Sequence, residues 1–425
     1  MSLPPLRRLP DGTVKQVGPL TGTRVWTIPG RANRPLATAR PDARALESGE
    51  HTRLCAFCQD RYLETTPEKE RLVGDSYERI GRVAASALQD SVAEFRRFGN
   101  LYEIVSAEYW RTNHDFQPAA DVVAWVDDYL ADPAGRAHIQ ALVATRSAAN
   151  GASADLRATA LDLIGGSHDV IVARRHVRDG ATRDDELASS GELTPDEHAV
   201  YMTFTARAAR EIADSQPYAA YVSVFQNWLR PAGASFEHLH KQIVAIDEYG
   251  PQTERELALL QEDPRLYQHA VADLSVREHL IVAATDGAVA FAGIGHRYPA
   301  FEVYSTCAAQ HPADHSASEL RAVSDLVHAL HAVTGVLVPT NEEWHYQPRR
   351  AGVPMPWRVV IKARLSIAAG FEGGTKVYVN TIDPWTLRQR AVDDLQHLRD
   401  AGRISADVRI GDECTPADAR LHYAD

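Results

Sequence analysis

The segment from residue 167 to residue 246 constrains the fold of this chain most, because it predicts a strand, a helix and two strands in close succession. Residues 167–176 include the β-branched run Val-Ile-Val and follow Gly-Gly, which is typical of a strand. A helix is expected over 194–214, since its first residues fit a capping box with proline in the first turn. Two strands are then expected, over 218–227 and 237–246. This order predicts an α+β unit with an antiparallel meander.

The second half of the chain also predicts strands and helices of this kind, although its sequence signals are weaker. A hairpin is expected over 279–294, with its turn at Asp286-Gly287. The other expected elements are strands over 24–29, 301–307, 357–365 and 376–382, and helices over 75–93, 118–132, 152–164, 316–335 and 385–402. We therefore expect an α+β protein of two similar halves, residues 1–250 and 251–425.

The charge and composition argue against several classes of protein. A net charge of −12 argues against a nucleic-acid-binding surface, which requires a basic face. No stretch approaches the roughly 18 uninterrupted apolar residues of a membrane span, and the first residues lack the apolar core of a secretory signal. Four cysteines in 425 residues do not make a disulfide framework. We expect a cytoplasmic protein that binds neither nucleic acid nor membranes.

The segment Asn227–Gln242, NWLRPAGASFEHLHKQ, carries the strongest chemical signal. Alternate residues of a strand share one face, so His238, His240 and Gln242 are expected on the same side. Just before them, Gly233 lies in a turn of small residues whose backbone N–H groups can approach an anion. Two imidazoles and an amide beside such a turn indicate a phosphate-handling site. The alternative is a pair of ordinary, hydrogen-bonded histidines on a half-buried strand.

Cys55 and Cys58 have the C-x-x-C spacing with which two thiolates bind one tetrahedral zinc ion. The sequence has no second C-x-x-C, so histidines would have to supply the other two ligands. The candidates are His168, His176, His238 and His240. Two alternatives remain open: a redox pair, for which the thioredoxin-like βαβ context is missing, and two buried cysteines that bind nothing.

Several segments, in order along most of the chain, resemble the galactose-1-phosphate uridylyltransferases of the histidine-triad superfamily. They are GPLTGTRVWTIPGRANRP (18–35), CAFC (55–58), Asn100 in FGNLYEI, HDVIVARRH (168–176), YVSVFQNWLRPAGASFEHLHKQIVAID (221–247) and GFEGGTKVYVNTIDP (370–384). The resemblance implies two histidine-triad-like halves, each a mainly antiparallel sheet with helices packed on it. It also implies a homodimer, in which the 370–384 motif of one subunit completes the site of the other.

The same resemblance implies roles for individual residues. His240 is the nucleophile, which stores a nucleoside monophosphate as a phosphoramidate, and its catalytic neighbours are Gln242 and Ser235. The ligands of a structural zinc ion are Cys55, Cys58, His176 and His238. The substrate-binding residues are Arg31, Arg34, Asn100, Asn227, Gly233, Phe371, Glu372 and Asn380.

The chain also departs from the family pattern. The family usually has proline and glycine around the nucleophilic histidine, where this chain has Leu239 and Lys241. Some members hold a second metal, an iron, on a glutamate and three histidines. Glu256 and His345 match two of these ligands, and the other two positions hold Val360 and Lys362. We therefore expect the second metal site to be absent.

The resemblance predicts a nucleotidyltransferase. It would move a nucleoside monophosphate, UMP in the first place and AMP as the second choice, from a nucleotide-sugar to a sugar 1-phosphate or to phosphate. Gln242 disfavours hydrolysis, because a neutral amide cannot protonate a leaving group. The alternatives are a nucleotide-conjugate hydrolase or phosphorylase, and a catalytically silent nucleotide-binding protein. Residues 118–164 look like a helical insertion that is not common to the family.

Overall fold

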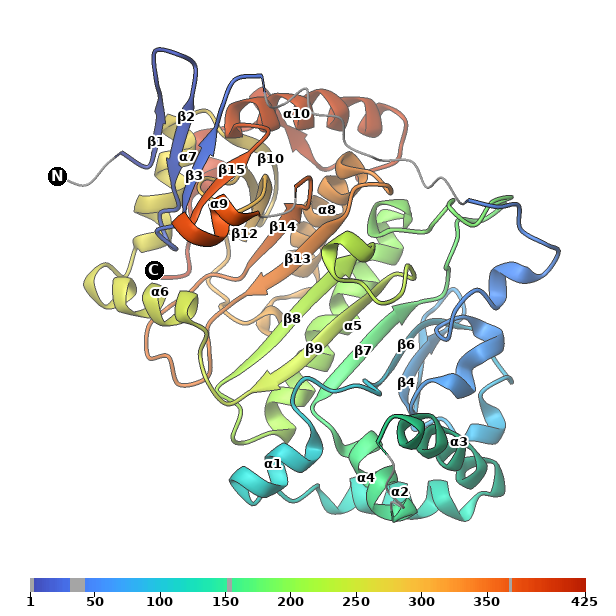
Figure 1. The fold of residues 1–425 in the computed structure, drawn as a ribbon. Coiled ribbons are helices and arrows are strands. Elements are labelled where there is room, and N and C mark those ends of the chain that lie inside the picture. The colour runs from blue at the N-terminus through green and yellow to red at the C-terminus, as the bar shows by residue number, and fades with distance from the viewer. Residues whose placement is uncertain (1–3, 31–42, 151–154, 367–368) are drawn as a thin grey trace.

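The computed structural model describes residues 4–30, 43–150, 155–366 and 369–425. Within these residues the chain forms a sheet of twelve strands and a sheet of four strands, with helices packed against them (Figure 1). The predicted α+β class is confirmed.

The twelve-stranded sheet consists of two groups of six strands, one from each half of the sequence. The first group has the order β8–β9–β7–β6–β4–β5, and its strands are β4 (Glu68–Val73), β5 (Glu78–Gly81), β6 (Ala93–Gly99), β7 (His168–Ala173), β8 (Tyr221–Trp228) and β9 (His240–Ile246). The second has the order β13–β14–β12–β11–β10–β16, and its strands are β10 (Ile281–Thr285), β11 (Ala288–Ala292), β12 (Ala300–Ser305), β13 (Thr340–His345), β14 (Arg358–Ala363) and β16 (Arg409–Ile410). The groups meet where β8 and β13 pair antiparallel, with Asn227 opposite Asn341.

The small sheet joins the start of the chain to its C-terminal part. Its strands are β1 (Leu6–Arg8), β2 (Val14–Val17), β3 (Arg24–Thr27) and β15 (Val377–Asn380). β15 follows α9 (Gly370–Thr375) and pairs in parallel with β3. The N-terminal strands therefore lie beside the second half of the protein, away from the strands that follow them in the sequence (Figure 1).

Two long helices cover one face of the large sheet. α5 (Pro195–Ser215) packs on β8 and β9, and α8 (Ala317–Thr334) packs on strands of the second group and on α5. Each begins with a complete capping box, Thr194 with Glu197 in α5 and Ser316 with Glu319 in α8. The other helices are α1 (Ala107–His114), α2 (Ala120–Ala131), α3 (Pro133–Asn150), α4 (Leu156–Gly165), α6 (Pro251–Glu262), α7 (Asp273–Arg277) and α10 (Pro384–Asp400).

Helices α2, α3 and α4 form a small bundle beside β4 and β6 (Figure 1). The bundle has a hydrophobic cluster of its own, which includes Trp125, Ile139 and Leu163. The predicted segment 118–164 is therefore helical, but it holds three helices instead of the two expected from the pattern.

A buried ion pair lies across the junction of the two strand groups. The ammonium group of Lys241 on β9 contacts the carboxylate of Glu342 on β13, and both side chains are fully buried. His331 Nε2 lies 2.8 Å from the second carboxylate oxygen of Glu342. Trp344 Nε1 donates to the first carboxylate oxygen over 2.6 Å. These partners compensate two charges that would otherwise be costly to bury.

The structure corrects several predicted elements. The helix predicted over 75–93 is wrong: β5 occupies part of it, and Tyr77 and Arg82 on either side have positive φ angles of 52° and 51°, which a helix does not allow. The strand predicted over 237–246 begins at His240, so His238 lies in the preceding loop. The hairpin with its turn at Asp286-Gly287 is confirmed.

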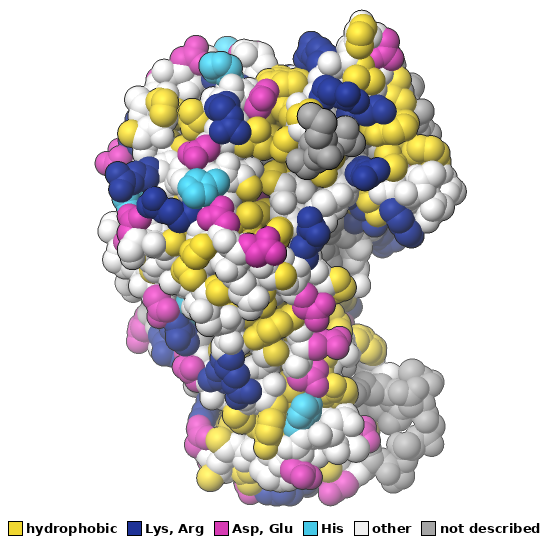
Figure 2. All heavy atoms as spheres, turned by 90° about the vertical axis from the view of Figure 1, so that its left-hand side faces the viewer, with side chains coloured by type: hydrophobic (Ala, Val, Ile, Leu, Met, Phe, Trp, Pro, Cys, Tyr) yellow, Lys and Arg dark blue, Asp and Glu magenta, His cyan; other side chains and the backbone are white. Residues whose placement is uncertain are grey.

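On the face drawn in Figure 2, acidic and basic side chains are interspersed, with hydrophobic side chains between them. Among the described residues, no helix combines the length and the apolar character that crossing a membrane requires.

Candidate active site and metal centre

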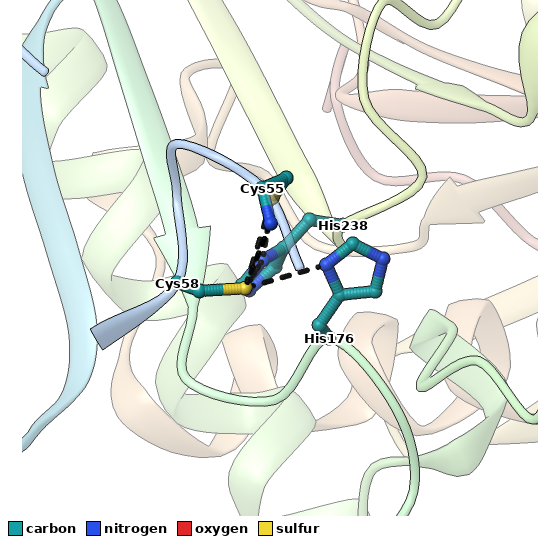
Figure 3. Close-up of side chains that lie close together, drawn as sticks. All are labelled: Cys55, Cys58, His176 and His238. Atoms are coloured by element: carbon teal, nitrogen blue, oxygen red, sulfur yellow. Dashed lines mark hydrogen bonds between the residues drawn. The ribbon is translucent and has the colours of Figure 1, made fainter. Parts of the chain in front are cut away.

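Two cysteines and two histidines from separate loops converge on one point. Cys55 and Cys58 belong to the loop before β4, His176 follows β7, and His238 precedes β9. Their four ligand atoms lie within 4.8 Å of one another, and Figure 3 shows the side chains directed toward a common centre. Of the four histidines considered from the sequence, the structure thus brings His176 and His238 to the cysteine pair.

The distances match those of a tetrahedral zinc site. With Zn–S and Zn–N bonds of about 2.3 and 2.0–2.1 Å, two sulfurs should lie about 3.8 Å apart, and a sulfur and a nitrogen about 3.5 Å apart. The two Sγ atoms are 3.8 Å apart. Cys58 Sγ is 3.4 Å from Nδ1 of His176, and Cys55 Sγ is 3.5 Å from Nδ1 of His238. The donor set and its spacing fit zinc.

Hydrogen bonds around the four side chains also favour the protonation states in which histidine and cysteine bind a metal ion. His238 Nε2 lies 2.7 Å from the carbonyl oxygen of Ala173, so Nε2 carries the proton and Nδ1 is left as the ligand atom. The hydrogen bond from the Cys55 thiol holds the pKa of the Cys58 thiol far below its ordinary value, and the same bond raises the pKa of Cys55. A thiolate is the form in which cysteine binds zinc.

His240 is oriented by the loop that carries the metal-site histidine. Its Nδ1 lies 2.7 Å from the carbonyl oxygen of His238, so Nδ1 carries the proton and donates it there. Nε2 therefore bears the free lone pair. Burial lowers the pKa of His240 to about 4, which keeps the imidazole neutral. The ring of Phe57 contacts it edge-on, with ring centroids 5.2 Å apart.

Gln242 is held by two neighbours from other elements. His168 Nδ1 accepts a hydrogen bond from the Ile104 N–H over 3.0 Å, so His168 Nε2 carries the proton and donates to Gln242 Oε1, also over 3.0 Å. Asn100 Nδ2 donates to the same oxygen over 3.3 Å, while the Tyr102 N–H fixes the Asn100 oxygen. The Gln242 oxygen is thus occupied, and its NH₂ group is left as a donor.

His240 and Gln242 both line a cavity of about 350 Å³. Both side chains face away from α5, whereas Lys241 between them points toward that helix, where its ammonium group lies 5.0 Å from the ring centroid of Tyr201. This alternation is the one predicted for the strand. The cavity is lined by Ala56, Phe57, Glu64, Thr65, Thr66, Phe98, Gly99, Asn100, Leu101, Tyr102, Ile104, His168, Val170, Ser235, Phe236, His240 and Gln242. The predicted residues Asn100 and Ser235 are therefore brought to the same cavity.

Other predicted residues lie elsewhere. Asn227 accepts a hydrogen bond from Asn341 across the β8–β13 junction over 2.7 Å and lines a neighbouring hollow. Gly233 lies next to it with a φ of +95°, which suits glycine best. Arg31 and Arg34 lie outside the described residues.

The C-terminal motif does not reach the cavity of its own chain. Phe371 is 48 % exposed on α9, where its ring lies 6.4 Å from that of Trp26. The Glu372 carboxylate accepts from the Ala369 N–H over 2.9 Å, at the start of the same helix. Asn380 is buried on β15 and donates to the His296 carbonyl over 3.2 Å. None of the three is among the cavity-lining residues.

The family described as "Domain of unknown function (DUF4921)" matches residues 9–423. The chain belongs to the DUF4921 family. No curated protein sequence matches it.

Two solved structures share the fold of this DUF4921 protein. One is an ADP-glucose phosphorylase from Arabidopsis thaliana with bound ADP-glucose, at a TM-score of 0.58 and 18 % identity, covering 89 % of this chain and 97 % of that one. The other is a galt-like protein from Arabidopsis thaliana, at a TM-score of 0.57 and 17 % identity, covering 89 % and 98 %. The DUF4921 protein therefore has the GalT-like fold that the motifs predicted.

Two of the four positions compared with a second metal site, Glu256 and Lys362, form ion pairs in the DUF4921 protein. The Glu256 carboxylate accepts hydrogen bonds from Arg358 and from the Tyr267 hydroxyl, each over 2.6 Å. The Lys362 ammonium group lies 2.6 Å from the Glu343 carboxylate, and His345 lies 3.5 Å from it. Guanidinium and ammonium groups thus supply positive charge at these carboxylates.

Sequence reasoning missed part of this site. The sequence pattern indicates His168 only as a metal ligand, whereas in the structure it orients Gln242. The aromatic cavity walls Phe57, Phe98 and Phe236 were not predicted either. Phe57 lies between the two cysteines, and Phe236 lies two residues before His238, so their nearness to the motifs was the available signal.

Proposed function

We propose that this protein moves a nucleoside monophosphate from a nucleotide-sugar to a phosphate acceptor, through a covalent intermediate on His240. The donor nucleotide is UMP in the first place, with AMP as the alternative, and the acceptor is a sugar 1-phosphate or inorganic phosphate. The observation that carries the proposal is the orientation of His240: its Nδ1–H is tied to the His238 carbonyl, so the Nε2 lone pair is free in a cavity shared with Gln242 and Ser235.

The chemistry follows from this orientation. His240 Nε2 attacks the α-phosphorus, a P–N bond forms, and the bond from phosphorus to the oxygen of the sugar phosphate breaks. The His238 carbonyl stabilises the positive charge that develops on the ring, because it accepts the Nδ1–H hydrogen bond. An oxygen of the acceptor phosphate then attacks phosphorus, and the P–N bond breaks. The Gln242 NH₂ group and the Ser235 hydroxyl are suited to hold the phosphoryl oxygens.

The structural relatives support the choice of acceptor. One of them is an ADP-glucose phosphorylase, which favours inorganic phosphate as an acceptor to be tested beside sugar 1-phosphates. A sugar phosphate leaves without being protonated, so the lack of an acid at Gln242 is no obstacle to transfer. Hydrolysis and silent binding remain the competing functions.

Intact-protein mass measurement tests the proposal directly. The protein is incubated with a panel of nucleotide-sugars, and we expect one nucleoside monophosphate to be added to it. Turnover is then compared with no acceptor, with phosphate and with sugar 1-phosphates. Turnover that needs an acceptor supports transfer, turnover without one indicates a hydrolase, and binding with neither adduct nor turnover indicates a silent protein.

We also propose that Cys55, Cys58, His176 and His238 hold a structural zinc ion. The four ligands leave no open position for substrate, so the metal would stabilise the protein without taking part in the reaction. Its effect on the nucleophile would be indirect, since the ligand His238 also provides the carbonyl that orients His240.

Replacing Gln242 by alanine should slow the formation of the adduct without preventing it. The variant loses a preorganised donor and keeps the nucleophile, and the loss of one such donor costs about 10²–10³ in rate. Rapid-quench measurement of the adduct with the preferred nucleotide-sugar gives the rate. Gln242→Glu is the matched variant, in which the donor is replaced by a negative charge. An undiminished rate in Gln242→Ala would remove the amide from the mechanism.

We propose in addition that the protein is a homodimer with shared sites. The support is that Phe371 and Glu372 lie away from the cavity of their own chain, while Phe371 is exposed. We expect a dimeric mass by light scattering at micromolar concentration.

A complementation experiment sharpens this prediction. His240→Ala and Phe371→Ala variants, each with reduced activity, are mixed so that subunits exchange. If one site takes residues from both chains, about a quarter of all sites become intact and activity rises. A monomeric mass with full activity, or a mixture no more active than the average of its two variants, would contradict shared sites.

A further inference from the structure

The bundle of α2, α3 and α4 supports one wall of the cavity beside His240. His138 on α3 hydrogen-bonds to the carbonyl oxygen of Thr65, with Nε2 2.8 Å away. The carbonyl oxygen of Leu163 on α4 lies so close to Gly99 that a Cβ atom there would come within 2.6 Å of it. Leu101 packs against the hydrophobic cluster of the bundle. Thr65, Gly99 and Leu101 all line the cavity.

His138 is fixed in one tautomer. The Tyr129 hydroxyl donates to His138 Nδ1 over 2.7 Å, since Nε2 must carry the proton that it donates to Thr65. The ring is 4 % exposed, and burial lowers its pKa, which favours the neutral form. Both nitrogens are therefore used, one to receive a hydrogen bond from α2 and the other to hold the cavity wall.

The remaining contacts make this wall rigid. Arg96 Nη2 donates to the Thr65 hydroxyl over 3.0 Å, and the Thr66 hydroxyl donates to the carbonyl of Gly99. The carbonyl of Thr65 points toward α3, because His138 binds it there. In a planar trans peptide the N–H of the next residue points the opposite way. The Thr66 N–H is thus directed away from His138, and Thr66 is one of the residues that line the cavity.

We propose that the Tyr129–His138 pair positions the peptide group between Thr65 and Thr66 so that its N–H binds an acceptor atom on the edge of the nucleotide base. The inference rests on the proposed function, since the cavity is taken to hold the nucleoside of the nucleotide-sugar. It gives the helical bundle a role in recognising the base. His138 acts through the wall and does not touch the substrate.

The test compares ligands with and without a base. Titration calorimetry measures the binding of UMP, AMP and ribose 5-phosphate, which has the same phosphate and sugar but no base. In His138→Leu we expect the preferred nucleotide to bind about tenfold more weakly, as for one lost hydrogen bond, while ribose 5-phosphate binds as in the wild type. His138→Gln should bind like the wild type, because its amide nitrogen can still donate to Thr65. Arg157→Ala serves as the control in the same bundle, since its ion pair with Asp127 is exposed.

Each outcome decides the inference. It is overturned if His138→Leu binds the preferred nucleotide as the wild type does, or loses ribose 5-phosphate in the same proportion. If His138→Leu does not fold, Tyr129→Phe takes its place, with the same contrast between nucleotide and ribose 5-phosphate expected. A wild type that binds a nucleotide selectively but forms no histidine adduct refutes the proposed transfer and leaves this inference standing. A wild type that binds neither nucleotide refutes both.

Discussion

Replacement of His240 by alanine should abolish the covalent adduct and lower turnover by at least about 10⁴-fold, as the loss of a nucleophile does. The reason is that Nε2 of His240 is the free imidazole nitrogen in the cavity beside Gln242, whereas His168 uses both its nitrogens for hydrogen bonds. Mass measurement after incubation with the preferred nucleotide-sugar detects the adduct, and steady-state kinetics give turnover.

Nucleotide binding to His240→Ala is the control for these two measurements. UMP or AMP should bind His240→Ala within a few-fold of the wild type, because the other residues that line the cavity are unchanged. Kinetics of the wild type should be ping-pong, with the first product released before the acceptor binds. Turnover of His240→Ala at the wild-type rate would rule out covalent catalysis at this residue.

Loss of the metal should destabilise the protein more than any single surface change. A structural zinc ion can contribute about 10 kcal/mol in small peptides, which is comparable to the whole stability of a domain. Here it would join the loop of Cys55 and Cys58 to the loops after β7 and before β9. We expect Cys58→Ser to lower the melting temperature markedly and to reduce zinc content, measured by plasma emission spectrometry, from about one equivalent per chain.

The control is Cys307→Ser, which removes a thiol away from the metal site. It should keep the zinc and the melting temperature of the wild type. Protein purified without chelators that holds under half an equivalent of zinc, or a Cys58→Ser variant as stable as the wild type, would contradict a structural metal.

Short sequence patterns predicted those helix starts and strand faces that are determined by residues close together in the sequence. The capping box at Thr194 and Glu197 marked the start of α5, and the alternation around His240 gave the correct faces of β9. The positive φ angles at Tyr77 and Arg82 could not be predicted, because tyrosine and arginine are equally compatible with a helix. They depend on the pairing of β5 with β4.

The site is formed by contacts between residues that are far apart in the sequence, and sequence patterns could not predict most of these contacts. The resemblance named the four metal-site residues, and the structure brings them together. It could not show that His168 orients Gln242, or that His138 reaches Thr65, because each contact joins segments about 70 residues apart that meet only in the folded protein. No periodicity in the sequence encodes such contacts.

The ion pair of Lys241 and Glu342 makes the two groups of strands in the large sheet depend on each other. Lys241 belongs to the first group of strands and its counterion Glu342 to the second, so neither group compensates this pair of charges by itself. Residues 1–250 alone would expose the edge of β8 as a template for aggregation and would leave Lys241 without its carboxylate. We therefore expect a fragment that holds only one of these two strand groups to aggregate, because it would carry both an unpaired strand edge and a charge without its counterion.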